Sequence, residues 1–440
     1  MADGHGIRAE AEVRLWGETV GALVELESGR VLFEYADEFR HRALEISPFY
    51  LPSDRRGPQS FEELLRKPAF QGLPGVLADA LPDAFGRRVI RAYYEARGQG
   101  EKALSPVQRL LYVGERALGA LSFHPAEELP IREAETTSLE VQRLAEDARS
   151  IVQGAPGVAI PEIYRIGSSA GGQRPKAIVH SDPESGAIRS GGTPLEPGEV
   201  PCILKFDGVG TDGGPGHLGA PQPYNRVEAA YGDMARAAGV DMAEIDVLET
   251  DGYAHLLVRR FDIVDGDRLH QHTFGGLRHV DYNDPGASSY EEYFRTIQQL
   301  GMAYDALTEG YRRMVFNVMA INQDDHVKNL SFHMDRGGTW SLTPAYDVTF
   351  AAGEGWTRSH QMRIRDKTSG IREDDLLALA REFGVKRPDR ILDETRGAIA
   401  DWERYAEKYE VPDDTRSAIR VELDRRASSL AGVHGANQTE

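Results

Sequence analysis

FNVMAINQDDHVKNLSF, residues 316–332, gathers acid, base, cation and amide side chains within six positions at the end of an apolar segment. The apolar part is typical of a helix, and a strand-like segment follows the charged turn. Charged residues rarely lie deep in a core unless they are paired or bound to a metal. The stretch therefore predicts one of two structures, a buried turn held by ion pairs or a site that holds a ligand.

Asp324 and Asn329 follow the pattern D-x-x-x-x-N, which is the spacing of the catalytic loop in protein kinases. In that loop the aspartate accepts the proton of the substrate hydroxyl, and the asparagine holds a magnesium ion. Two common residues also meet this spacing by chance, so the pattern alone is weak evidence. His326 and Lys328 lie between them and are further candidates for contacts to a nucleotide cofactor.

A predicted β-hairpin strengthens the kinase interpretation. The strand-like segments 330–334 and 339–343 flank the turn signal DRGG at 335–338, and the second segment runs on to Asp347. Because a hairpin brings its two ends together, Asp347 is expected to lie close to Asn329. Mg²⁺ prefers oxygen ligands, so these two residues are the candidate metal ligands. The alternative is a buried ion-pair turn beneath a helix.

Lys205 stands alone in VPCILKFDG, an apolar strand-like segment at residues 200–208. A lysine in such a strand is costly unless its ammonium meets anions. The helical pattern of residues 224–240 carries Glu228, which is a candidate partner as in the lysine–glutamate pair of kinases. The alternative is an edge-strand lysine whose charged end reaches water.

A turn of small residues, GSSAGGQRPK at 167–176, lies between two predicted strands. Its backbone N–H groups could cradle phosphates, and Lys176 could add positive charge. It is not a Walker A loop, because glutamine follows the last glycine. An ordinary hairpin loop is the alternative. The candidate cofactor contacts within the turn are Ser168, Ser169, Gly171 and Gly172.

Two further segments bear on nucleotide binding. LLVRRFD, residues 256–262, is expected to connect the two lobes under the adenine, where it offers backbone groups and Phe261. GVGTDG, residues 208–213, matches G-x-G-x-x-G, but a dinucleotide site needs a helix to begin there. The following GPGHLGAPQP cannot start a helix, so we interpret this match as a loop.

The histidines predict no metal site. His270 and His272 alternate along a strand-like segment, which indicates a surface position, and the single cysteine, Cys202, makes a zinc site improbable. No Ser-His-Asp set can be proposed from sequence spacing.

Length and composition limit the class of protein. A chain of 440 residues exceeds one ordinary core, so two or three domains are expected. The net charge of −19 disfavours direct binding to phosphate backbones. A single cysteine excludes an internal disulfide, and we expect neither a secretory signal nor a membrane-spanning helix. These features suit a cytoplasmic protein.

The order of predicted elements indicates an α+β fold. Short strands at 12–35, a helix from Pro82 and a helical segment at 105–125 form a small β/α subdomain, residues 1–125. Residues 126–265 are predicted to form a nucleotide-binding lobe of mixed strands and helices. Residues 266–440 read as a mainly helical lobe whose β feature is the hairpin.

Several ordered blocks of the chain resemble the HipA family of bacterial toxin–antitoxin serine/threonine kinases along nearly its whole length. The blocks are LWGETVGAL, GLPGVLADALPDAFG, GSSAGGQRPKA, ILKFD, NQDDHVKNLSF and LTPAYDV. The resemblance implies a two-lobed, protein-kinase-like fold with an added N-terminal subdomain. The last two blocks, which flank the hairpin, are the most specific.

The resemblance also implies roles for individual residues. Asp324 would be the catalytic base, Asn329 and Asp347 would bind Mg²⁺, and Lys205 would contact ATP. Ser169 matches the serine that family members autophosphorylate, with the adjacent Ser168 as a competing acceptor. One departure is Arg259, because other members carry an acidic residue at this place in the adenine connector.

By this resemblance the chain is an ATP- and Mg²⁺-dependent protein kinase that acts as a toxin on the translation machinery. Aminoacyl-tRNA synthetases are the known target class. The implied partner is a HipB-like helix-turn-helix antitoxin, through which DNA would mainly be contacted. Two alternatives stay open, a nucleotide-binding pseudokinase that serves as corepressor and a small-molecule kinase. The intact acidic, amide and lysine residues argue against the pseudokinase.

Overall fold

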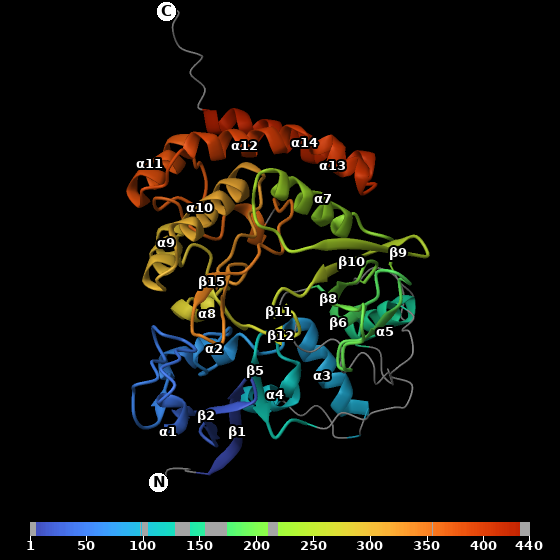
Figure 1. Cartoon of the computed structure of the whole chain (residues 1–440). Helices are drawn as coiled ribbons and strands as arrows, with labels where there is room; N and C mark the ends of the chain where they lie inside the picture. The colour runs from blue at the N-terminus through green and yellow to red at the C-terminus, as the bar shows by residue number, and fades with distance from the viewer. Residues whose placement is uncertain are drawn as a thin grey trace, which may run out of the picture.

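The computed structural model describes residues 6–96, 98, 104–127, 141–154, 174–209, 219–353 and 355–431. Figure 1 shows a β-rich N-terminal part at the bottom, a second sheet beside the middle, and a stack of helices at the top. Strands and helices are mixed without regular alternation, so the predicted α+β class is confirmed. Among the described residues, no helix combines the length and the apolarity needed to cross a membrane.

The N-terminal part is built on a five-stranded antiparallel sheet of order β4-β3-β2-β1-β5. Alternating residues of its strands, such as Val13 and Leu15, are buried, as the alternating sequence predicts. The strands are β1 (Ile7–Leu15), β2 (Glu18–Leu26), β3 (Val31–Tyr35), β4 (Gln59–Ser60) and β5 (Leu121–His124). The helices are α1 (Asp37–Arg40), η1 (Glu62–Leu64), α2 (Gly75–Ala78), α3 (Ala84–Ala96), α4 (Pro106–Val113) and η2 (Gly114–Arg116).

The predicted helical segment at 105–125 is only half helical. It begins with a capping box, in which Ser105 and Gln108 satisfy each other's backbone N–H groups. The helix ends at Val113, and Gly114 follows with a positive φ of 55°. Residues 121–124 instead form β5, which pairs with the edge of β1. Pairing with a strand more than a hundred residues away overrode the local helical pattern.

The second sheet is also antiparallel and has the order β7-β6-β8-β10-β9. The predicted turn at Asp251-Gly252 joins its last two strands, and both residues have positive φ as a tight hairpin requires. The strands are β6 (Lys176–Ser181), β7 (Ile188–Ser190), β8 (Val200–Lys205), β9 (Ile245–Thr250) and β10 (Tyr253–Arg259). Two helices flank this sheet, α5 (Val141–Val152) and α7 (Tyr224–Ala237).

The C-terminal part is mainly helical, and the predicted hairpin is present as β14 (Ser331–Met334) and β15 (Trp340–Leu342). A third strand, β13 (His270–Thr273), pairs with β14, so the hairpin is not the only β feature described there. A short hairpin, β11 (Ile263–Val264) and β12 (Asp267–Arg268), precedes it. The helices are α8 (Phe274–Arg278), α9 (Tyr290–Gln299), α10 (Tyr304–Met319), η4 (Gly355–Arg358), α11 (Glu373–Phe383), α12 (Pro388–Ala400), α13 (Trp402–Lys408) and α14 (Asp413–Ala431).

His270 and His272 are fully buried, so the surface position predicted for them is wrong. The N-terminal part covers β13 and supplies partners for both rings. His272 Nδ1 lies 2.6 Å from Asp79 Oδ2, and its Nε2 lies 3.0 Å from Ser47 Oγ. These are the residue types of a hydrolase triad, but Ser47 has no exposed surface. The chain of contacts therefore joins two parts of the protein and offers no nucleophile to a substrate.

The junction between the N-terminal part and the C-terminal part is tight. Asp79 also accepts hydrogen bonds from the backbone N–H and the hydroxyl of Thr273, at 2.8 and 2.7 Å. A Cβ atom at Gly75 would lie 1.9 Å from the carbonyl oxygen of Gly276, so only glycine allows α2 to approach α8 this closely.

The N-terminal part also contacts the segment that joins the two lobes. Gly119 N–H donates to Asp262 Oδ2 at 2.8 Å, and the same carboxylate forms a buried double contact with Arg260 at 2.6 and 3.0 Å. The indole of Trp16 donates to the carbonyl oxygen of Arg268 at 2.6 Å. The N-terminal part thus contacts the connector at Asp262 and the following β11–β12 hairpin at Arg268.

Candidate active site

Lys205 ends strand β8 and points into the space between the two lobes. Its side chain is buried, and its Nζ lies 2.5 Å from Glu228 Oε1 and 2.5 Å from Asp347 Oδ1. Burial alone would lower the pKa of Lys205, but the two carboxylates outweigh it and the pKa is raised. The structure thus confirms the predicted Lys205–Glu228 ion pair and adds Asp347 as a second partner.

Asp347 interacts with charged side chains from several helices and strands. Burial opposes its charge, but Lys205 and then Lys176 stabilise the carboxylate and hold its pKa well below the ordinary value. Lys176 is buried at the start of β6, directly opposite Lys205 in the strand register. Burial lowers the pKa of Lys176, and the Asp347 charge opposes this shift. Two lysines and one carboxylate therefore share this site.

The backbone at Asp347 has a φ of +52°, a left-handed conformation that non-glycine residues rarely adopt. The neighbouring Tyr346 fixes this turn, because its hydroxyl donates to the carbonyl oxygen of Lys328 at 2.7 Å. Strained backbone of this kind persists only where surrounding contacts hold it, often at functional sites. The same contact brings the end of the hairpin back to the charged turn, as its sequence predicts.

The charged turn 324–329 is closed by its own hydrogen bonds. Asn329 donates its side-chain N–H to the carbonyl oxygen of Asp324 at 3.0 Å and its backbone N–H to the carbonyl oxygen of His326 at 2.9 Å. The amide oxygen of Asn329 is then the atom that can bind a cation. Lys328 places its ammonium 5.3 Å from the ring centre of Tyr282.

The Asp324 carboxylate is about 39% exposed, in contrast to the buried Asp325. Its pKa is raised, chiefly by burial of part of the group and further by the negative charge of Asp347. His326, at 3.9 Å, and the Trp356 side chain oppose this shift. Burial lowers the pKa of His326. A carboxylate with a raised pKa and an open face is suited to accept a proton.

Asp325 is a residue of the site that the sequence analysis missed. It is buried and accepts three hydrogen bonds, from Tyr290 Oη at 2.9 Å, His360 Nδ1 at 3.0 Å and the backbone N–H of Gln361 at 2.7 Å. No local pattern separates Asp325 from the adjacent Asp324, because its side-chain partners lie 35 residues away along the chain. Asp325 anchors the turn, while Asp324 stays accessible.

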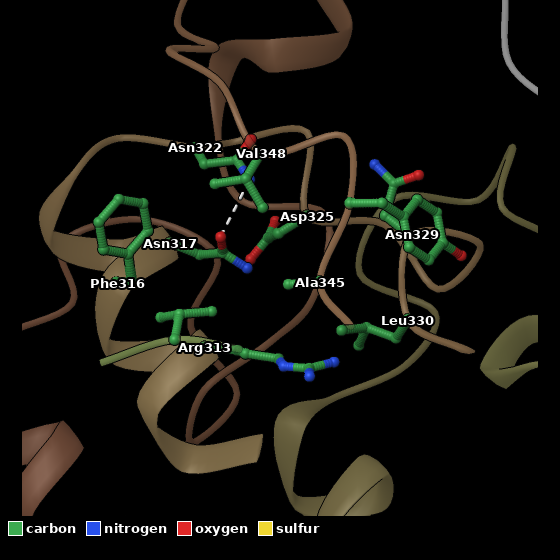
Figure 2. Close-up of a pocket in the computed structure, with 11 residues that line it drawn as sticks. Arg313, Phe316, Asn317, Asn322, Asp325, Asn329, Leu330, Ala345 and Val348 are labelled. Atoms are coloured by element: carbon green, nitrogen blue, oxygen red, sulfur yellow. Dashed lines mark hydrogen bonds between the residues drawn. The ribbon is translucent and has the colours of Figure 1, made fainter. Parts of the chain in front are cut away.

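Asp325 also lines a cavity of about 20 Å³ under the turn, which Figure 2 shows. Asn322 and Asn317 lie across it, joined by a 2.9 Å hydrogen bond, and the Arg313 guanidinium closes the lower side. A space of this size holds about one water molecule. It is therefore part of the support of the turn and too small for a nucleotide.

The predicted connector residues have definite partners. Phe261 is partly buried and stacks on Tyr346, with ring centres 5.3 Å apart. Arg259 is half exposed and pairs with Glu244 at 2.8 Å, so its side chain is engaged at the surface.

The structure brings most of the predicted site residues together. Contacts or charge interactions connect Lys205, Glu228, Lys176, Asp347, Asp324, His326 and Asn329. The predicted phosphate-loop residues Ser168, Ser169, Gly171 and Gly172 lie outside the described residues, as do positions 210–213 of the GVGTDG segment.

Two family models match the chain. The HipA-like C-terminal domain matches residues 168–402, and the HipA N-terminal domain matches residues 11–124. Together they cover the site and the N-terminal sheet.

Individual relatives and a solved structure agree with these matches. A Sinorhizobium fredii protein named “Putative kinase Y4dM” is 24% identical over 431 residues, covering 91% of this chain and 92% of the relative. “Putative kinase Y4mE” of the same organism is 28% identical over 193 residues, covering 39% and 46% of the two chains. The HipA structure from Shewanella oneidensis, solved with HipB and operator DNA, has a TM-score of 0.64 at 17% identity. The alignment covers 94% of this chain and 95% of that one, which shows the same fold.

Proposed function

The chain belongs to the HipA family, and on that premise we propose that it is an ATP- and Mg²⁺-dependent serine/threonine protein kinase. The observation that carries the proposal is the placement of Lys205 between Glu228 and Asp347, beside a turn that presents Asp324 and Asn329. Protein kinases need each of these groups in a comparable role.

The residues present fit a magnesium nucleotide. Asp347 and Asn329 offer oxygen atoms, which Mg²⁺ prefers, and Lys205 and Lys176 offer buried cations beside them. When bound, ATP supplies the phosphoryl group and Mg²⁺ neutralises the charge on it.

The protein's own task is mainly to position groups and to stabilise charge. Glu228 holds the Lys205 ammonium at the site, and the Asp325 network holds the turn that carries Asp324. Asp324 would accept the proton of the acceptor hydroxyl as the hydroxyl oxygen bonds to the γ-phosphorus and the bond from that phosphorus to the leaving ADP breaks.

Replacing Asp324 by alanine should slow phosphoryl transfer by roughly 10²–10⁴-fold, the usual value of general-base help. ATP affinity should stay nearly intact, because Asp324 faces the acceptor side. Transfer to dephosphorylated casein and ATP binding by calorimetry measure the two effects. Asp366→Ala is the matched control, since Asp366 is almost fully exposed and pairs only loosely with Arg363 at 3.5 Å. A collapse of nucleotide affinity would instead identify Asp324 as a metal ligand.

We infer that the kinase phosphorylates itself on Ser169. The serine precedes Lys176 closely in the chain, and Lys176 lies opposite Lys205 at the proposed nucleotide site. A phosphoserine adds about −1.5 to −2 charges, which would repel the triphosphate and switch the enzyme off.

The expected result is one added phosphate on Ser169 after incubation with Mg²⁺-ATP, followed by loss of ATP binding. Intact-mass and peptide mass spectrometry measure this, with Ser168→Ala and Ser169→Ala as a matched pair. Phosphate found only on Ser168, or a Ser169 phosphoform that binds ATP normally, would contradict the inference.

The proposed biological role is that of a toxin paired with a helix-turn-helix antitoxin. The support is the fold shared with the HipA protein that was solved with HipB and operator DNA. With a net charge of −19, DNA contact would come mainly through the partner. The proposed acceptor is a component of the translation machinery, in the class of aminoacyl-tRNA synthetases, which places the action in the cytoplasm. Phosphopeptide mass spectrometry after pulsed expression tests this role, and a chain without transfer would favour the corepressor alternative.

A further inference from the structure

Lys328 carries a positive charge that no described residue neutralises. Its side chain is partly buried, and across the described residues its ammonium forms neither an ion pair nor a hydrogen bond. Lys205 differs, because Glu228 and Asp347 hold its ammonium between two carboxylates. A partly buried cation without an anion is costly, so the Lys328 ammonium is available to the negative charge of a ligand.

Lys328 lies in the turn that carries the proposed base and a proposed metal ligand. It directly precedes Asn329, which closes the turn through hydrogen bonds to the carbonyl oxygens of Asp324 and His326. The carbonyl oxygen of Lys328 accepts a hydrogen bond from the Tyr346 hydroxyl at 2.7 Å, so its backbone is fixed as well. An unpaired cation in this short segment suits the phosphoryl group that passes from nucleotide to acceptor.

The ring of Tyr282 is the contact that holds this ammonium. Lys328 Nζ lies 5.3 Å from the centre of the ring, within the range of a cation–π interaction. The same ring packs beside the imidazole of His326, with ring centres 5.8 Å apart and planes inclined by 44°. One aromatic side chain therefore contacts two of the residues of the turn.

Asp281 fixes the backbone from which Tyr282 projects. The Asp281 carboxylate is buried and accepts hydrogen bonds from the backbone N–H of Ala69 at 3.2 Å and from the backbone and side-chain N–H groups of Asn283 at 2.9 and 2.7 Å. Ala69 belongs to the N-terminal part, which thus helps to place the ring. A ring held in place limits the rotamers of the long lysine side chain that lies over it.

The aromatic face of Tyr282, and not its hydroxyl, makes these contacts. The hydroxyl forms no hydrogen bond with any residue that the structure describes. Tyr282 also packs against the large hydrophobic cluster of the C-terminal part, so simple packing is the alternative explanation for the ring. Leucine can supply such packing but offers no π face to an ammonium, which allows an experiment to separate the two explanations.

We propose that Tyr282 is a positioning residue whose ring holds the Lys328 ammonium ready for the phosphoryl group that is transferred. This inference rests on the proposed kinase function and deepens it. It assigns to the turn a positive charge that stays free of carboxylates until the phosphate is present.

Substitutions of Tyr282 test the role of the ring. Tyr282→Leu should lower kcat with dephosphorylated casein by about 3- to 30-fold, the value of a partly desolvated cation–π contact, and leave the KM for casein within about twofold. Tyr282→Phe keeps the ring and should stay within about twofold of the wild type. Lys328→Ala removes the ammonium itself and should lower kcat at least as much as Tyr282→Leu.

Tyr304→Leu is the matched control. Lys386 Nζ lies 5.4 Å from the centre of the Tyr304 ring, so this variant also removes an aromatic ring from beside a lysine. Tyr304 begins α10, and the chain enters the turn only after the other end of this helix, about 24 Å away at 1.5 Å per residue. Its kcat should equal that of the wild type.

A second measurement needs neither nucleotide nor activity. Reductive methylation with a ¹³C-labelled reagent makes the lysines visible by NMR, and the Lys328→Arg variant identifies the Lys328 signal. The aromatic ring current should shift this signal upfield in the wild type and in Tyr282→Phe. In Tyr282→Leu the signal should return toward the position of an exposed lysine. A signal at the same position in all three proteins would contradict the contact.

A double-mutant comparison distinguishes positioning from a general structural effect. In a Lys328→Ala background, Tyr282→Leu should cause less than about a twofold further loss, because the ammonium that it positions is already gone. Equal losses in both backgrounds, a loss in Tyr282→Phe as large as in Tyr282→Leu, or a normal kcat for Lys328→Ala would overturn this inference alone. A wild-type chain that transfers no phosphate would overturn the proposed function and this inference with it.

Discussion

Replacing Asp347 by asparagine should abolish phosphoryl transfer, with a loss of about 10³-fold or more. Even one hydrogen-bond donor to a developing negative charge is worth about 10²–10³ in rate, and Asp347 would supply the full negative charge that holds the metal. Asparagine keeps the size of the side chain, so the turn at Tyr346 can persist. Lys205 keeps its other partner, Glu228.

The measurement is transfer to casein together with ATP binding in the presence and absence of Mg²⁺. In the wild type, Mg²⁺ should strengthen ATP binding, and chelation of Mg²⁺ should remove activity. In Asp347→Asn, the affinity for ATP should become nearly independent of Mg²⁺. Glu244→Gln is a suitable control, because Glu244 pairs with Arg259 at the surface away from this cluster. Normal activity of the purified Asp347→Asn variant would contradict the assignment of Asp347 as a Mg²⁺ ligand.

Replacing Asp325 by alanine should destabilise the protein by roughly 3–5 kcal/mol, the usual cost of removing one member of a buried charged network. The change leaves Tyr290, His360 and the Gln361 N–H without their acceptor in a buried region. Each buried donor without a partner carries a cost of its own. The expected loss is a large share of the 5–15 kcal/mol that stabilises a typical folded domain.

Urea unfolding followed by circular dichroism measures this effect, and the adjacent aspartate provides the control. Asp324→Ala should change the free energy of unfolding by less than about 1 kcal/mol, because Asp324 is partly exposed. Replacing Asp324 is thus expected to lower activity but not stability, whereas replacing the adjacent Asp325 is expected to lower the free energy of unfolding. A cost below about 1 kcal/mol for Asp325→Ala would show that the network does not support the turn.

The local parts of the site could be predicted because they depend on short-range patterns. A lone lysine in an apolar strand needs an anion, and Glu228 lies on the next helix, so their pairing follows from sequence order. The hairpin that returns the chain from Asn329 to Asp347 is encoded by its turn residues. Helix α7 and the β9–β10 hairpin follow from spacing and from Asp251-Gly252.

The remaining features depend on docking between distant segments, which the sequence does not display. His270 and His272 have the alternation of a surface strand, but the N-terminal part covers that strand and buries them. The partners of Asp325 lie 35 or more residues away on either side. Segment 121–124 became a strand because an edge of the N-terminal sheet was free to pair with it.

The attachment of the N-terminal part to the connector has a consequence for how the two lobes move. Gly119 holds the connector at Asp262, and Trp16 holds the hairpin that follows it at Arg268. Bending at this place would first have to break the buried contact between Gly119 of the N-terminal part and Asp262. The N-terminal part is therefore expected to restrict bending between the two lobes, because these contacts link it to the connector and to the hairpin after it.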